Sequence, residues 1–346
     1  MNSTLNNITI KHCMPHNDLW SSFLAVTDAI YDSSKMPLSG ALNIPEKKII
    51  SAFIAFRDNK PLARLVVYEP NFTEETSVWC FGAFESINDS ELCRHLFDTV
   101  INAAAAKCIK NIIGPMNGST WENYRIALNW DYPTFFSEVY QPPYYAQLLI
   151  DAGFQTLAKY STHLQSNISY AADKIQPLRT RLKQNGVTIR NMDLTNFEQE
   201  IVKLYPFITS AFAHNFLYSP IQFEDFRDKY RAQKKWLDTR FVYFAENEEK
   251  ELIGLVVGYP DYFNQTNKTL IVKTVARNPD KKYNGIAQVL CANISDAANS
   301  LGFNRIIHAF MHQDNKSVNL SGFFSGEKLR EYALYNRMVK QPLIEN

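Results

Sequence analysis

The chain has 346 residues, of which 46% are hydrophobic and 21% charged, and its formal net charge is +1. This is the composition of an ordinary globular protein, and the length suits two domains at roughly 150 residues per domain. The near-neutral charge gives no overall case for binding nucleic acid or a membrane surface.

The five cysteines are scattered and never form a C-x-x-C pair. Their spacing argues against a disulfide framework or a zinc site, so no metal is expected. The first residues lack the basic-then-apolar pattern of a secretory signal, and no apolar stretch reaches the roughly 18 residues of a membrane span. We therefore expect a cytoplasmic monomer or homodimer that binds neither nucleic acid nor membrane.

The first half of the chain predicts a mixed α/β domain. It begins with a strand at 8–12, a short helix at 20–30 and a loop at 33–46. Strands at 49–57 and 62–68 form a hairpin, and a third strand spans 78–84. A helix at 90–106, capped from Asn88, Asp89 or Ser90, is followed by a strand at 111–116, a helix at 144–152 and a strand at 157–165.

The second half repeats this order of elements. Helices are predicted at 171–185, 197–212 and 223–236, and strands at 187–192, 241–246, 252–259 and 270–276. A helix from 285, a strand at 305–311, a helix from about 316 and a strand at 332–339 complete the chain. Pro206 lies inside the second of these helices, where we expect a break or a kink. We place the domain boundary near Ser166, which gives domains at 1–165 and 166–346.

The turn between the strand at 270–276 and the next helix carries the clearest pattern for ligand binding. Lys281 and Lys282 precede Asn284, Gly285, Ile286 and Ala287. A helix N-terminus offers unpaired N–H groups and the positive end of a dipole, which together bind phosphate. Gly285 permits close approach of the backbone because it has no Cβ. The pattern predicts a phosphate-binding loop at 281–287, although an ordinary strand–helix turn has the same pattern.

The turn at 282–287 resembles the pyrophosphate-binding loop of the GNAT acyltransferase superfamily, R/Q-x-x-G-x-G/A, with Lys in the first position and Ala in the last. The order of elements in both halves is also similar to that of a GNAT domain. The chain looks most like tandem-domain, largely uncharacterised bacterial acetyltransferase-like proteins. Further matching stretches are FGAFES at 81–86, GPMN at 114–117, YQPPYY at 140–145, Gly254, YPD at 259–261 and residues 332–335. The implied fold is α/β (α+β), with two tandem GNAT-like domains, each a mixed, mostly antiparallel sheet flanked by helices.

The resemblance implies acetyl-CoA, or another acyl-CoA, as co-substrate of the second domain. The pantetheine arm would pair with the strand end at Val275, Ala276 and Arg277. The pyrophosphate would bind the N–H groups of Asn284, Gly285, Ile286 and Ala287, beside Lys281 or Lys282. Asn315 would contact the arm, or would cap a helix.

The first domain is expected to lack this site. Its corresponding turn, ESINDSE at 85–91, has carboxylates and no basic residue, so it would repel pyrophosphate. We expect a degenerate copy without a phosphate loop, kept for packing or used to wall the acceptor pocket.

The resemblance also implies direct transfer of the acyl group to a primary amine of a small molecule or peptide in a ternary complex. A backbone N–H of the splayed strand would stabilise the carbonyl oxygen, a base would take the amine proton, and an acid would return one to the thiolate. The tyrosine that the family commonly places four residues before the glycine near the last helix is replaced by Gly322, ahead of Gly326. Candidates for these roles are Tyr332, Tyr335, His308 and His312, with Glu246 as a base. Each of them has an ordinary structural alternative as a core or packed residue.

Two other functions stay open. A Fem-type aminoacyl-tRNA-dependent transferase also pairs two such domains, although the long basic helical arm of that family is missing here. The second alternative is a non-catalytic relic of the fold, which would bind acyl-CoA or sense a ligand without turnover. Turnover of simple amines and binding of charged tRNA would separate the three.

Overall fold

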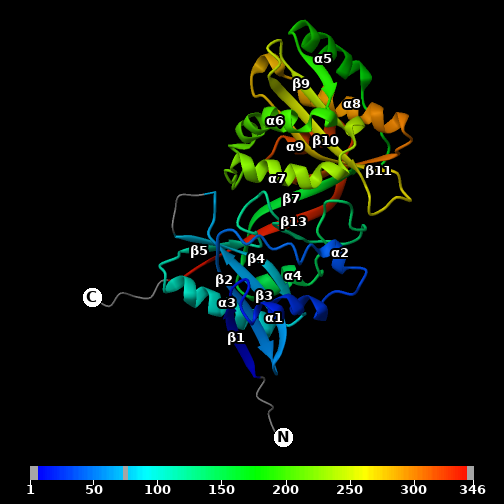
Figure 1. Cartoon of the computed structure of the whole chain (residues 1–346). Coiled ribbons are helices and arrows are strands. Elements are labelled where there is room, and N and C mark those ends of the chain that lie inside the picture. Colours follow the sequence, from blue (N-terminus) through cyan, green and yellow to red (C-terminus); the bar gives the residue numbers. More distant parts are fainter. Residues whose placement is uncertain (1–6, 73–76, 341–346) are drawn as a thin grey trace. The chain divides into compact units, whose positions relative to one another are not determined.

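The computed structural model describes residues 7–72 and 77–340, which divide into two units (Figure 1). Of these residues, the first unit holds 7–72, 77–134, 138–159 and 332–340, and the second holds 135–137 and 160–331. This division differs from the predicted ranges 1–165 and 166–346. Residues 160–165, at the end of the first range, belong to the second unit, and residues 332–340, near the end of the second range, belong to the first unit.

The first unit is built on a sheet with strand order β1-β2-β3-β4-β5-β13. The pairs are antiparallel except for β4 with β5, and β6 pairs with β13. The strands are β1 (Ile8–Cys13), β2 (Ile49–Arg57), β3 (Lys60–Tyr68), β4 (Val78–Ser86), β5 (Asn111–Gly114), β6 (Ile126–Ala127) and residues 332–338 of β13 (Glu327–Met338). The helices are α1 (Trp20–Ala25), η1 (Val26–Ala29), α2 (Met36–Ser39), α3 (Ser90–Ala105) and α4 (Tyr145–Asp151). The short helix α2 lies within the stretch predicted as loop.

Helix α3 forms because its ends and its apolar face agree with the helical period. The Asp89 side chain accepts the backbone N–H of Leu92 at 2.9 Å and so caps the first turn. Leu92, Leu96 and Val100 recur every three to four residues and are fully buried against the sheet. Their burial anchors the helix over the core of the first unit.

The second unit has the strand order β7-β12-β11-β10-β9-β8, in which only the described pair β11 with β12 is parallel. Its strands are residues 160–165 of β7 (Gln155–Gln165), β8 (Thr188–Asn191), β9 (Val242–Glu246), β10 (Leu252–Pro260), β11 (Thr269–Arg277) and β12 (Arg305–His312). The helices are α5 (Ala172–Gln184), η2 (Leu194–Asn196), α6 (Phe197–Phe212), α7 (Phe223–Gln233), η3 (Lys234–Trp236), η4 (Thr239–Phe241), η5 (Lys281–Tyr283), α8 (Ile286–Ser300) and α9 (Ser317–Phe323). Helices α5 and α8 share one apolar core with the sheet, and α6 packs on β10 and β11.

Of the two expectations at Pro206, the break is wrong, because α6 is one helix from Phe197 to Phe212, and the kink stays a prediction. A proline has no backbone N–H, so it leaves the carbonyl four residues earlier, at Val202, without its intrahelical partner. Val202 is 57% exposed, so water can bond this carbonyl. The helix therefore tolerates the proline on its solvent side.

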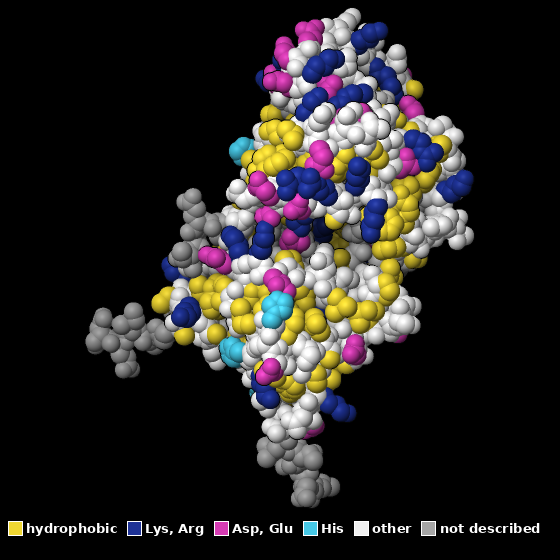
Figure 2. Space-filling model, viewed as in Figure 1, with side chains coloured by type: hydrophobic (Ala, Val, Ile, Leu, Met, Phe, Trp, Pro, Cys, Tyr) yellow, Lys and Arg dark blue, Asp and Glu magenta, His cyan; other side chains and the backbone are white. Residues whose placement is uncertain are grey.

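Basic and acidic side chains are interspersed on the face drawn in Figure 2, in keeping with the net charge of +1. Within residues 7–72 and 77–340, none of the helices has both the length and the apolar character needed to cross a membrane.

Candidate acyl-transfer site

Strands β11 and β12 separate in the middle of the second sheet. They pair in parallel from Thr269 opposite Arg305 to Val272 opposite His308. Beyond this point β11 continues to Arg277 in register with β10, and β12 continues to His312 in register with β7. The edge of β11 at 274–277 thus faces a gap and offers backbone N–H and C=O groups to an extended ligand. Val275, Ala276 and Arg277, the predicted partners of the pantetheine arm, lie on this edge.

The predicted phosphate loop follows β11 directly. It forms η5 and then the N-terminus of α8, where Gly285 is the N-cap residue with φ 93° and ψ −8°. This left-handed conformation strains any residue with a Cβ. No side chain caps α8 at this N-cap. Its first-turn N–H groups, including those of Ile286 and Ala287, have no intrahelical carbonyl to bond and are available to an anion.

One predicted donor is already used. The backbone N–H of Asn284 donates to the carbonyl of Lys281 at 3.1 Å and closes the turn of η5. Its assignment as a pyrophosphate donor is therefore corrected, because a single N–H engaged in a turn is not free for a ligand. The side chain of Ile286 is fully buried in the core, so only its backbone is placed for binding.

Helix α5 holds the loop from outside. The Arg181 guanidinium donates to the carbonyl of Asn284, and the Asn185 side chain donates to the carbonyl of Lys282 at 2.9 Å. Both side chains are exposed, and Arg181 adds positive charge beside Lys281 and Lys282. Neither residue was predicted from the sequence. Their spacing of four on one helix face was the available signal, but nothing in the sequence tied that face to the loop.

Asn315 has its ordinary structural role. Its side-chain oxygen accepts the backbone N–H of Ser317 at 3.0 Å, at the start of α9. The contact with a pantetheine arm stays a prediction, now restricted to the amide nitrogen.

His308 lies where the two strands part. Its Nδ1 is 2.7 Å from Oγ of Ser321 on α9, and Nε2 has no hydrogen-bonding partner among the described residues. Burial, and then the neighbouring His163, lower the pKa of His308 to about 4. His308 is therefore neutral at physiological pH, and its Nε2 is left without a bond to another described residue. His312 is packed between Tyr160 and Phe216, and burial lowers its pKa.

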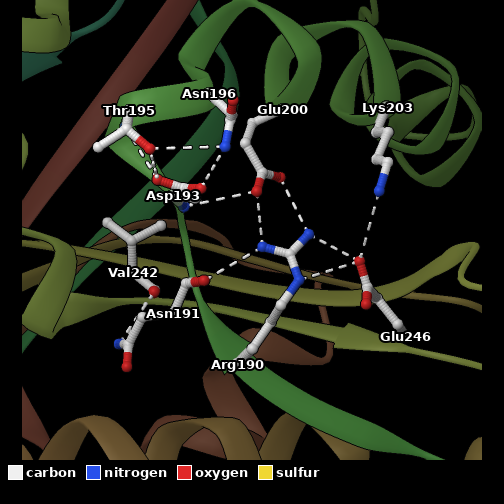
Figure 3. Close-up of polar contacts among 9 residues, drawn as sticks. All are labelled: Arg190, Asn191, Asp193, Thr195, Asn196, Glu200, Lys203, Val242 and Glu246. Atoms are coloured by element: carbon white, nitrogen blue, oxygen red, sulfur yellow. Dashed lines mark hydrogen bonds and ion pairs between the residues drawn. The ribbon is translucent and has the colours of Figure 1, made fainter.

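Glu246 is committed to a cluster of charged side chains on β8, β9 and α6 (Figure 3). Arg190 donates to Glu246 at 2.7 and 3.0 Å, and it also forms two bonds with Glu200 at 2.7 and 3.0 Å. Burial alone would raise the pKa of Glu246, but the bonds and charge of Arg190 outweigh it, so the pKa lies below its usual value. The cluster lines a hollow of about 330 Å³. A carboxylate held this way is a poor general base, and the structural interpretation of Glu246 is favoured.

Tyr332 and Tyr335 belong to the first unit, not to the unit that carries the loop. The Tyr332 hydroxyl donates to Glu138, and its side chain is 3% exposed. Tyr335 pairs with Gly114 on β5 and is 2% exposed in the first core. The last strand of the chain contributes residues 332–338 to the first unit. Both tyrosines are therefore buried core residues there, which is the structural alternative to a catalytic role.

Residues 207–321 match the sequence profile described as the acetyltransferase (GNAT) family. The matched residues lie within the second unit, which carries the loop. A bacterial ceramide synthase of Caulobacter vibrioides is 23% identical over 223 residues, which is 61% of this chain and 56% of that relative. The chain thus spans little more than half the length of the curated relative that it matches.

Two solved structures are similar in fold. A tandem GNAT protein from the clavulanic acid biosynthesis pathway has a TM-score of 0.54 at 9% identity, covering 97% of this chain and 100% of the other. A fungal GCN5-related glucosamine N-acetyltransferase region within a multi-domain β-N-acetylglucosaminidase has a TM-score of 0.59 at 13% identity, covering 96% of this chain and 38% of the other. The expected tandem GNAT fold is confirmed.

The first GNAT-like unit has its corresponding gap filled by its own chain. Strands β4 and β5 pair only as far as Cys80 opposite Ile113. Past that point Met116 donates its N–H to the carbonyl of Phe81 at 2.7 Å, and the Asn117 side chain accepts the N–H of Ala83 at 2.8 Å. The α3 N-terminus is capped by the Asp89 carboxylate, as described above. In the first unit the protein's own chain thus bonds the edge of β4 and caps the N-terminus of α3, the two places that correspond to the open strand edge and uncapped helix of the second unit.

Proposed function

We propose that this protein is an acyl-CoA-dependent N-acyltransferase that transfers an acetyl group from acetyl-CoA to a primary amine of a small molecule or peptide. The observation that carries the proposal is the pairing of two open features in one unit. These are the edge of β11 at 274–277, beyond its pairing with β12, and the uncapped N-terminus of α8 that follows it. The GNAT profile match and the ceramide synthase relative support acyl transfer in general.

Groups of this chain could bind each part of the acyl-CoA and stabilise the charge that develops in the reaction. The edge of β11 would align the pantetheine arm, and the α8 N-terminus with Lys281, Lys282 and Arg181 would hold the pyrophosphate. A backbone N–H at the gap would stabilise the developing negative charge on the thioester oxygen. The neutral amine then attacks directly, without a covalent enzyme intermediate. The reaction calls for no metal, nucleic acid or membrane, and we place it in the cytoplasm.

Calorimetric titration with acetyl-CoA tests the proposal, using Gly285→Glu beside Gly302→Glu as a matched control. Both glycines have positive φ, 93° and 75°, so both substitutions carry similar backbone strain of about 1–2 kcal/mol. Gly285→Glu also places its Cβ 2.9 Å from the end of the Leu178 side chain, which must shift, whereas Gly302→Glu meets no atom closer than 3.4 Å. Gly285 begins α8 and Gly302 follows its C-terminus, so only the first places a carboxylate at the proposed pyrophosphate position. Thermal unfolding first establishes that both variants are folded.

Binding to the wild type and to Gly302→Glu, with loss in Gly285→Glu, is the expected result. A folded wild type that binds neither acetyl-CoA nor a longer acyl-CoA would overturn the proposal. A second candidate, a non-catalytic acyl-CoA sensor, is favoured by Gly322 in the position of the family's usual tyrosine. Binding without turnover across an amine screen would identify the sensor, and binding of charged tRNA instead would identify a Fem-type transferase.

A further inference from the structure

Four polar side chains of the second unit form a continuous chain of hydrogen bonds that ends at His308, the last residue of β12 that pairs with β11. Ser161 Oγ lies 3.1 Å from Nε2 of His163, both on β7. The Nδ1 of His163 lies 3.1 Å from Oγ of Ser321, and the same Oγ lies 2.7 Å from Nδ1 of His308. Ser321 is 2% exposed and His163 is 8% exposed, so water does not readily replace these contacts.

The backbone makes room for this chain. A Cβ built on Gly326 would lie 2.3 Å from Oγ of Ser321 and 3.0 Å from Nδ1 of His308. Any side chain at this position would displace the serine hydroxyl from between the two rings. A glycine is therefore required here by close approach to the hydroxyl, although its φ is not positive.

The Ser321 hydroxyl limits the tautomers of the two histidines. It has one proton and two lone pairs, so it can donate to only one Nδ1, and at least one of the two rings must carry its proton on Nδ1. When the hydroxyl donates to one Nδ1 and accepts from the other, the two rings are in opposite tautomers and the three groups form a directed chain of hydrogen bonds. In that arrangement a change of tautomer in one ring is coupled through the hydroxyl to the opposite change in the other.

We propose that His308, Ser321, His163 and Ser161 form a proton relay that carries the proton released by the attacking amine from the gap to Ser161. This inference rests on the proposed acyl transfer and deepens it, because it assigns the path of the proton. His308 would be the group that meets the substrate, through its open Nε2. Ser321, His163 and Ser161 would be positioning residues that act through it.

The relay balances without any further reactant. The amine nitrogen bonds to the carbonyl carbon, the C–S bond breaks, and its electron pair leaves on sulfur. The amine proton passes to Nε2 of His308, the Nδ1 proton of His308 passes to Ser321, and the Ser321 proton passes to Nδ1 of His163. The Nε2 proton of His163 then leaves through Ser161. Both rings end neutral, with their tautomers exchanged.

The surroundings of both rings disfavour a charged imidazolium but allow a proton to be transferred between neutral rings. Burial and His163 lower the pKa of His308 to about 4, and burial and the positive charge of Lys328 lower that of His163. An imidazolium is thus unfavourable at either ring, whereas a concerted shift through neutral rings forms none. A lone His308 with such a pKa would be a weak base.

Nitrogen-15 NMR of the histidine side chains tests the coupling directly, on the full chain at pH 7 and without a known acceptor. The wild type should show His163 and His308 neutral and in opposite tautomers. Ser321→Ala should abolish the coupling and let both rings adopt one tautomer. Ser317→Ala, on the same helix and with no contact to either ring, is the matched control and should resemble the wild type. Identical tautomers in the wild type, a protonated ring at pH 7, or no change in Ser321→Ala would overturn the relay.

Acetyl-CoA titration of the same samples separates this inference from the proposed function. Ser321→Ala should bind acetyl-CoA as the wild type does, and with an accepted amine its kcat should fall about 10²-fold, the range of general acid–base catalysis. Normal binding with unchanged kcat would sink the relay and leave acyl transfer intact. Coupled tautomers in a wild type that binds no acyl-CoA would overturn both.

Discussion

The side-chain oxygen of Asn117 accepts the backbone N–H of Ala83 at 2.8 Å, at the point where β4 leaves β5 in the first unit. The same point in the second unit, past Val272, is a gap between two strands. A polar side chain of the protein thus occupies in one unit the place that the other offers to a ligand. The two units have the same strand order around this point. In the first unit the strand edge is bonded to the protein's own chain, and in the second unit it is open.

Removal of this bond should destabilise the first unit without creating a second binding site. In Asn117→Ala the Ala83 N–H loses its partner, which should cost about 1 kcal/mol, the low end of the range for an unsatisfied donor because this bond is only partly buried. Urea unfolding measures the loss, with Asn88→Ala, at an exposed position of the same unit, as a control that should change little. Titration should still give one acetyl-CoA per chain. A stoichiometry of two in the wild type would contradict the assignment of the site to one unit.

Charge at the phosphate loop gives a second prediction. Lys281→Glu and Lys282→Glu each replace an exposed positive charge beside the α8 N-terminus, and each should weaken acetyl-CoA binding about tenfold or more at low salt. Lys268→Glu makes the same charge change just before the opposite end of β11 and should bind as the wild type does. The difference should shrink as ionic strength rises, because salt screens exposed charges. Equal weakening in all three variants would indicate a general charge effect and count against the loop.

The sequence predicted most of what positions the site, and the reasons are local. The strand at 270–276, the turn with Gly285 and the apolar stripe of α8 follow from spacing and from glycine's backbone freedom, which depend on neighbouring residues. The positions of Tyr332 and Tyr335 were not predictable this way, since strand pairing across the whole chain decides which unit they join. The contact of α5 with the loop and the His163–Ser321 bond also join residues far apart in sequence. Pro206 misled for a different reason: its cost depends on solvent exposure, which the local pattern does not give.

The charged cluster in Figure 3 should stabilise the second unit, with a defined dependence on pH. Arg190→Gln leaves the buried Glu246 without its bonds, and breaking such a pair costs about 3 kcal/mol, the low end of the range because Arg190 is 32% exposed. In the wild type the pKa of Glu246 lies below its usual value of 4.5, so its stabilisation is present above that pH and is lost as pH falls through the folded pKa. Without Arg190, burial would raise that pKa instead.

The destabilisation by Arg190→Gln should therefore be largest at pH 7 and smaller at pH 4.5, as measured by urea unfolding at both values. Arg231→Gln is the matched control, because Arg231 bonds Glu198 at 2.8 Å on an exposed surface and should matter little at either pH. Equal losses in the two variants would show that burial of Glu246 does not decide the effect. Acetyl-CoA binding should persist in folded Arg190→Gln, since the cluster is assigned a structural role.

A pair of neighbouring glycines tests the packing around Ser321. Gly326→Ala places a Cβ 2.3 Å from Oγ of Ser321, so the hydroxyl must move, and overpacking of this kind costs about 1–3 kcal/mol. Gly322→Ala places a Cβ with nothing within 4 Å, inside α9, and should stabilise the helix by about 0.5–1 kcal/mol. Thermal unfolding of both variants measures these opposite signs. The histidine tautomers should change in Gly326→Ala and stay as in the wild type in Gly322→Ala, because only the first displaces the hydroxyl from between His163 and His308. Unaltered tautomers in a destabilised Gly326→Ala would mean that the hydroxyl does not couple the two rings.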